Sequence, residues 1–173
     1  MPTAQLELET QLEPAQITQR AKDWSNPKDS PPSWRESRSQ HSGEYRNLDI
    51  SQDLNAEIER ATRILELEDD WDGEGSSGYT EDTFNRAVEF LTEHSKGLWE
   101  LCGSLLPVPR IGPGPDGSID LHWKLPSHEL LVNIPSDPNE VPTFYGDNYG
   151  ALKNRGTLEP KKFNAEIVPW LMN

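Results

Sequence analysis

The chain has 173 residues, 33% of them hydrophobic, with 15 prolines, 12 glycines and a formal net charge of −14. This length suits one domain of ordinary size plus a tail, and the low apolar content indicates that part of the chain packs little. The negative charge repels phosphates and anionic lipids, which disfavours binding to nucleic acid or to a membrane. A protein partner with a basic surface, or divalent cations, would suit it better.

Cysteine content and hydropathy limit the kinds of site and the compartment that we expect. Cys102 is the single cysteine, so the sequence offers neither an internal disulfide nor a cysteine-based zinc site. It lies among leucines, and we expect it in the core. No apolar run approaches the roughly 20 residues that span a bilayer. Residues 1–14 are polar and acidic, unlike a secretion signal, and we expect a cytoplasmic protein.

Residues 1–47 are expected to form an extended, partly disordered arm. Prolines interrupt this stretch, and serine, arginine, glutamine and glutamate fill the gaps. Trp24, Trp34 and Tyr45 are unusual in such a segment, because disordered chains are poor in aromatic residues. Either these three side chains fold back onto the domain, or they are anchors that bind a partner protein.

Residues 48–173 are predicted to form an α+β domain that begins with two antiparallel helices. Apolar residues recur at helical spacing between residues 54 and 67, with Ser51 or Asp53 available as the N-cap. A second helix is expected from about residue 81 to residue 102. Thr80 is its natural N-cap, Gly97 could bend or break it, and Gly103 would end it.

The hydrophobic period then changes to two. Extended segments are predicted at residues 107–111, 118–124, 129–134 and 142–145, separated by turns rich in proline and glycine. They predict a three- to four-stranded antiparallel meander with the helices packed on one face. Residues 164–171 are consistent with a short closing helix, in which Trp170 offers an anchor.

The loop at residues 70–81 is close to a calcium-binding EF-hand loop. Asp70, Asp72, Glu74 and Glu81 occupy loop positions 1, 3, 5 and 12, and a glycine occupies position 6. Position 5 is usually a shorter acid or amide, position 8 is serine instead of an aliphatic residue, and no second loop is present. The alternative is an acidic turn between the two helices, with Trp71 packed between them.

A second candidate site combines Asp120, His122 and His128. Both histidines flank a predicted hairpin on what should be its solvent face, and Asp120 precedes His122 by two residues. A hydrolase could use such a group if the three side chains converged in a pocket. The chain has no Gly-x-Ser-x-Gly motif, so a serine nucleophile of that kind is not indicated. No cofactor other than calcium is suggested.

Two runs of the sequence resemble a known group of proteins. They are Asp69-Asp70-Trp71-Asp72-Gly73 and Pro115-Asp116-Gly117-Ser118-Ile119-Asp120-Leu121-His122-Trp123. The chain resembles a widespread family of small uncharacterised bacterial proteins with a W-D-G … P-D-G-S-I-x-L-x-W pattern, over about residues 55–150. The resemblance implies a structural role for the Trp-Asp-Gly turn. It brings no activity, cofactor or catalytic residue with it.

Together these features predict a non-enzymatic protein-binding module of the antitoxin, immunity or accessory-subunit type. Its acidic body would meet a basic partner, and its N-terminal arm would wrap that partner. A mimic of nucleic acid is a variant of this hypothesis. The alternatives are a calcium-binding protein that uses the 70–81 loop and a hydrolase that uses Asp120, His122 and His128.

Overall fold

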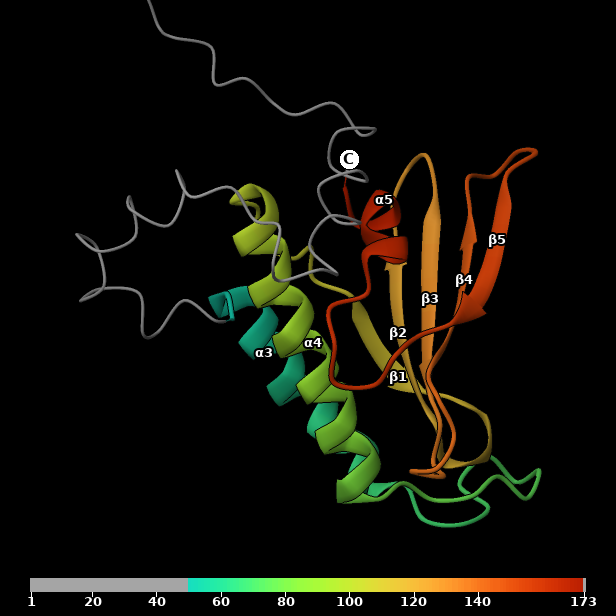
Figure 1. Ribbon diagram of the computed structural model, residues 1–173. Coiled ribbons are helices and arrows are strands. Elements are labelled where there is room, and N and C mark those ends of the chain that lie inside the picture. Colours follow the sequence, from blue (N-terminus) through green and yellow to red (C-terminus); the bar gives the residue numbers. More distant parts are fainter. Residues whose placement is uncertain (1–49, 173) are drawn as a thin grey trace, which may run out of the picture.

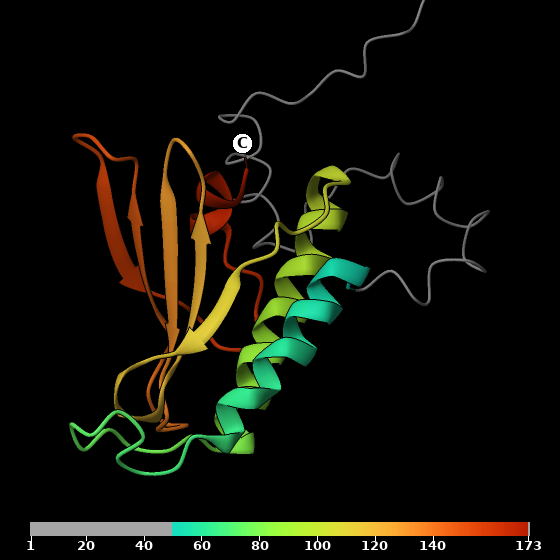
Figure 2. The same cartoon turned by 180° about the vertical axis from the view of Figure 1, so that it is seen from behind.

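The computed structural model describes residues 50–172. Two antiparallel helices cover one face of a five-stranded antiparallel sheet, and no helix of these described residues covers the other face (Figures 1 and 2). The α+β class is confirmed. The counts were wrong, because the described residues contain five strands instead of three to four and three α-helices instead of two. No helix in this part of the chain is long and apolar enough to cross a membrane.

The first helix, α3 (Gln52–Ala61), begins at Ser51. The Ser51 Oγ accepts a hydrogen bond from the N–H of Leu54 at 3.2 Å, which satisfies one of the unpaired donors of the first turn. The helix tightens into a 3₁₀ turn, η3 (Thr62–Glu66). Three side chains at helical spacing are buried against the rest of the domain: Leu54, Ala61 and Ile64.

The second helix, α4 (Glu81–Cys102), has the predicted ends. The Thr80 Oγ1 accepts from the N–H of Thr83 at 3.2 Å, and Gly103 ends the helix in the left-handed conformation at φ 70°. The helix does not break at Gly97, since α4 continues through it to Cys102. A Cβ at Gly97 would lie 2.2 Å from a ring carbon of Phe163, so glycine there allows the Phe163 ring to approach the helix.

The sheet is a simple meander in the order β1-β2-β3-β4-β5, with every neighbouring pair antiparallel. On β2, Ile119, Leu121 and Trp123 are buried, and the residues that alternate with them are more exposed. The strands are β1 (Arg110–Pro113), β2 (Ile119–Lys124), β3 (Glu129–Ile134), β4 (Thr143–Asp147) and β5 (Lys153–Thr157). A one-turn helix, η4 (Pro115–Gly117), joins β1 to β2.

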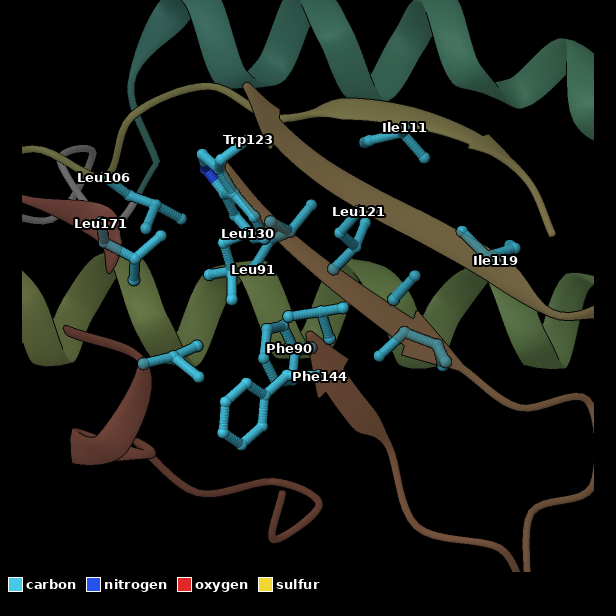
Figure 3. Close-up of a cluster of buried hydrophobic side chains, with 14 of the residues drawn as sticks. Phe90, Leu91, Leu106, Ile111, Ile119, Leu121, Trp123, Leu130, Phe144 and Leu171 are labelled. Carbon is cyan, nitrogen blue, oxygen red and sulfur yellow. The ribbon is translucent and has the colours of Figure 1, made fainter. Parts of the chain in front are cut away.

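The core lies between the sheet and α4. Figure 3 shows Leu121, Trp123 and Leu130 of the sheet together with Phe90 and Leu91 of α4, and all five are buried. Burial of this apolar surface is the main stabilising term of the fold. Cys102 is half-buried and packs against the same core.

The chain after β5 returns along the helix-covered face of the sheet (Figure 1). It forms η5 (Ala165–Ile167) and the short closing helix α5 (Val168–Leu171). Trp170 is buried, and a Cβ at Gly146 of β4 would lie 2.5 Å from its ring. The Trp170 ring therefore fixes α5 to the sheet, as expected of an anchor.

Candidate functional site

The acids of the 70–81 loop hold the loop together through its own backbone. The Asp69 Oδ1 accepts from the N–H of Gly78 at 2.8 Å, and the Asp70 Oδ1 accepts from the N–H of Gly75 at 2.8 Å. Asp72 accepts from the N–H of Glu74 at 2.9 Å and from both the N–H and the hydroxyl of Ser76. These bonds, led by the Ser76 hydroxyl, lower the pKa of Asp72.

The four predicted calcium ligands do not form a ligand set. Asp70 and Asp72 accept N–H groups of the loop, whereas Glu81 lies in the first turn of α4, where its charge faces the positive end of the helix dipole. Between residues 50 and 172, no group of three or more His, Cys, Asp or Glu side chains is arranged to hold a metal ion. The geometry therefore favours an acidic turn between the two helices.

The aromatic residue that seals this turn is Tyr79, and the expectation for Trp71 was wrong. Trp71 is 41% exposed, and the centroid of its ring lies 6.2 Å from the centroid of the Tyr79 ring. Tyr79 is buried and its hydroxyl donates to the carbonyl of Gly114 at 2.7 Å. Burial raises the pKa of the Tyr79 hydroxyl. The Tyr79–Gly114 bond ties the interhelical loop to the turn between β1 and β2.

Asp120 and His122 lie on the face of the sheet that no helix covers, and each has a partner there. The Asp120 Oδ1 accepts from the side-chain amide of Asn133 at 2.7 Å, directly across the β2–β3 pair. His122 Nε2 lies 3.1 Å from a carboxylate oxygen of Glu129. Both are ordinary cross-strand polar contacts.

His128 is buried on the helix-covered face, so the expectation that it shares the solvent face with His122 is wrong. Its Nε2 lies 2.9 Å from the carbonyl oxygen of Trp170, and its Nδ1 lies 2.9 Å from the hydroxyl of Ser127. It precedes Leu130 by two residues and shares the inward direction of that side chain. Asp120, His122 and His128 therefore do not converge.

The charge of the domain is strongly uneven. Residues 50–103 expose eleven carboxylates and three cations, whereas residues 104–172 expose five carboxylates and six cations. We call the first set the acidic helical surface. Its carboxylates lie on α3, on η3, on the 67–80 loop and on α4: Asp53, Glu59, Glu66, Glu68, Asp69, Asp70, Asp72, Glu74, Glu81, Asp82 and Glu89.

Six of these carboxylates have no hydrogen-bond or ion-pair partner for the side chain among residues 50–172, and three of the six lie between the last turn of α3 and the residues just beyond η3; the other three are Asp53, Glu74 and Glu81. Glu59, Glu66 and Glu68 are exposed, and none has a hydrogen-bond or ion-pair partner for its side chain among residues 50–172. Asp82 instead pairs with Arg86 at 3.1 Å, and Glu89 lies 3.6 Å from Lys161. A carboxylate that no cation of the protein pairs with can pair with a cation of a binding partner.

A groove of about 530 Å³ separates the second half of α4 from residues 159–166. Phe163 and Gly97 form its apolar part, and charged side chains of both signs line the remainder: Glu93, Lys96, Glu100, Glu159, Lys162 and Glu166. Glu159 and Lys162 pair with each other. Four carboxylates against two lysines make the charged lining of the groove net acidic.

The uncovered face of the sheet has a shallow hollow of about 470 Å³ over β3, β4 and β5. Leu131, Tyr145 and Arg155 line it together with neighbouring residues of the same strands. The Tyr145 hydroxyl donates to Asp147 at 2.8 Å, and Asp147 also accepts from Lys153 at 3.1 Å. Arg155 has no ion-pair partner among the described residues.

The predicted partner-binding residues Trp24, Trp34 and Tyr45 lie outside the described residues, as does the arm boundary at residue 47. Comparison with known proteins adds nothing to this picture, since no family model, no curated protein and no solved structure matches the chain.

Proposed function

We propose that the protein is a non-enzymatic protein-binding module that binds a basic surface of another protein through its acidic helical surface. One observation carries the proposal: residues 50–103 expose eleven carboxylates and three cations, whereas the exposed charges of the rest of the described domain are nearly equal in number. An antitoxin, an immunity protein or an accessory subunit would use such a surface. We expect it to act in the cytoplasm.

The physical basis is electrostatic complementarity. Charges of one sign on a continuous surface attract an oppositely charged partner over roughly a Debye length, about 8 Å at physiological salt, and raise the association rate. Glu59, Glu66 and Glu68 supply three such charges at little structural cost, because no side chain of the described domain holds them. A surface of this kind repels DNA and RNA.

The candidate catalytic groups support a binding role instead of catalysis. Asp120 is bonded to Asn133 and His122 to Glu129 on the uncovered face of the sheet, whereas His128 is bonded to the Trp170 carbonyl on the other face. All three have structural partners, and they lie on two opposite faces of the sheet. We therefore assign them to the support of the sheet.

The arm at residues 1–47 belongs to the same proposal. Trp24, Trp34 and Tyr45 would supply aromatic contacts to the partner, since tryptophan and tyrosine contribute most to binding hot spots. Deletion of residues 1–47 should leave the domain folded and abolish capture of the partner. Unchanged capture by the truncated protein would remove the arm from the proposal.

The acidic helical surface is tested by capture from the cells in which the protein is made. The tagged full chain and the triple variant Glu59→Gln, Glu66→Gln, Glu68→Gln are compared at low and high salt. We expect the wild type to retain a partner at low salt and the variant to lose most of it. A matched control removes three exposed carboxylates of the other half: Glu140, Glu159 and Glu166.

The control decides between specific and general charge effects. Loss of the partner in the first variant alone supports the acidic helical surface. Equal loss in both variants would show that only net charge matters, and retention in both would remove electrostatics from the proposal.

A further inference from the structure

The two edges of the sheet differ in whether side chains of another element bond their outward backbone groups. At the β1 edge, the carboxylate of Glu57 accepts the N–H of Ile111 at 2.8 Å, and the guanidinium of Arg60 donates to the Ile111 carbonyl at 2.9 Å. Both side chains come from α3, which packs beside β1 (Figure 2). The backbone groups at the centre of this edge are therefore satisfied and closed to another strand.

The β5 edge is open in the described domain. Four of its five residues are exposed, and no described element lies beyond it (Figures 1 and 2). Since β4 bonds one side of the strand, alternate N–H and C=O groups of Lys153–Thr157 point outward, and none bonds to residues 50–172. On the uncovered face this strand carries Lys153, which pairs with Asp147 at 3.1 Å, and Arg155, which has no ion-pair partner among the described residues.

Residues 6–13 have the complementary sequence, Leu-Glu-Leu-Glu-Thr-Gln-Leu-Glu. Leucines stand at positions 6, 8 and 12 and glutamates at 7, 9 and 13, an alternation that is typical of a half-buried strand. It matches β2 in type, where apolar residues face the helices and polar residues face away. A strand in this orientation beside β5 would place its glutamates on the face that carries Lys153 and Arg155.

We propose that residues 6–13 of the same chain add to the β5 edge as a sixth strand of the sheet. Main-chain hydrogen bonds would provide most of the affinity, as in other cases of strand addition. Opposite charges on Glu7 or Glu9 and on Lys153 or Arg155 would lie across the strand pair. The leucines would lie on the helix-covered side, beside Phe144, whose ring already reaches to 2.8 Å of a Cβ placed at Gly156.

The connecting chain is long enough for this. Residues 14–49 span up to roughly 120 Å when extended, whereas a domain of the described length has a radius of gyration of only about 14 Å. The arrangement is independent of the proposed function. It would convert the open edge into an internal strand and leave residues 14–47 free for a partner.

Amide hydrogen exchange of the full chain, read by NMR, tests the proposal. The outward amides of Lys153–Thr157 should exchange at least about tenfold more slowly in the wild type than in Leu8→Pro, because proline removes a donor and disrupts a central strand position. Ser37→Pro, placed elsewhere in the same arm, is the control and should exchange like the wild type. Equal exchange in all three proteins overturns the proposal.

Charge reversal then identifies the contact. The variant with Glu7→Lys and Glu9→Lys should lose protection of β5, and the further change Arg155→Glu should restore it, while Lys153 keeps its ion pair with Asp147. Protection that Arg155→Glu does not restore would overturn the predicted pairing. Dilution should leave the protection of the β5 amides unchanged. Protection that falls on dilution, together with a dimer at high concentration, would assign the added strand to a second copy of the chain. That result would overturn pairing within one chain.

Discussion

His94 Nε2 accepts a hydrogen bond from the backbone N–H of Asn164 at 3.1 Å, joining two residues that are 70 positions apart. The other ring nitrogen, Nδ1, lies 2.8 Å from the carbonyl oxygen of Phe90 one turn earlier in α4. The His94 ring also stacks on the ring of Phe90, with the two ring centroids 3.9 Å apart. The neutral form with the proton on Nδ1 satisfies both bonds, so His94 fastens the returning C-terminal segment to the central helix.

Protonation of His94 should destabilise the fold. Burial lowers its pKa from 6.5 to about 4, so the unfolded chain binds a proton at a higher pH than the folded chain does. The His94 contribution is therefore present above pH 6.5 and is lost as the pH falls toward 4. Between pH 7 and pH 5 it should remove about 2 kcal/mol from the free energy of unfolding.

Urea unfolding of the wild type and His94→Gln at both pH values isolates this contribution, because the carboxylates titrate alike in both proteins. The variant should be less stable at pH 7 and should lose about 2 kcal/mol less than the wild type on going to pH 5. Parallel losses in the two proteins would show that His94 does not titrate as described.

Gly97→Ala should destabilise the protein although alanine favours a helix. The new methyl group would meet the Phe163 ring at 2.2 Å, and such overpacking costs about 1–3 kcal/mol, against a gain in helix propensity of about 1 kcal/mol. In a Phe163→Ala background the same substitution should become neutral or stabilising. A double-mutant cycle by thermal unfolding measures this change of sign, and the same cost in both backgrounds would refute the contact.

The β1 edge should depend on Glu57. Its carboxylate accepts from both Arg60 and the N–H of Ile111, and the Arg60 contact lowers its pKa. Glu57→Ala leaves a half-buried N–H without a partner and should cost about 1–2 kcal/mol of unfolding free energy. Glu59→Ala, two residues along on the exposed side of α3, is the matched control and should change stability by less than about 0.5 kcal/mol.

The 70–81 loop should behave as a structural turn. Asp72→Ala removes the acceptor for two backbone N–H groups and the Ser76 hydroxyl, so amides of Glu74 and Ser76 should exchange faster while α4 stays protected. Titration with millimolar Ca²⁺ in a calorimeter should give no binding heat with the wild type. A saturating heat, together with a higher melting temperature, would restore the calcium hypothesis.

The sequence predicted best the features that depend on residues close together in the chain, namely helix ends and strand alternation. Ser51, Thr80 and Gly103 mark helix ends in the sequence and in the structure, and the alternation of Ile119, Leu121 and Trp123 placed β2 correctly. β5 was missed because its inward positions are Asn154 and Gly156, which leave no apolar alternation to detect.

Long-range contacts account for the other errors. Nothing near Gly97 in the sequence reveals that Phe163 packs on it, and nothing near His128 reveals the carbonyl of Trp170. The spacing of the acids in the 70–81 loop is close to that of calcium ligands in an EF-hand loop. The same positions also allow the acids to accept N–H groups of the loop. Only the folded backbone shows which of the two roles, calcium ligand or turn acceptor, these acids have the geometry for.

The measurement that tests the central claim most directly is a carbodiimide cross-link between the full chain and the protein it captures. The reagent joins carboxylates to lysine amines in direct contact, and mass spectrometry identifies the joined residues. We predict cross-links from Glu59, Glu66 and Glu68 to lysines of the partner. Cross-links confined to the five exposed carboxylates of the other half, Asp116, Asp137, Glu140, Glu159 and Glu166, would contradict binding through the acidic helical surface.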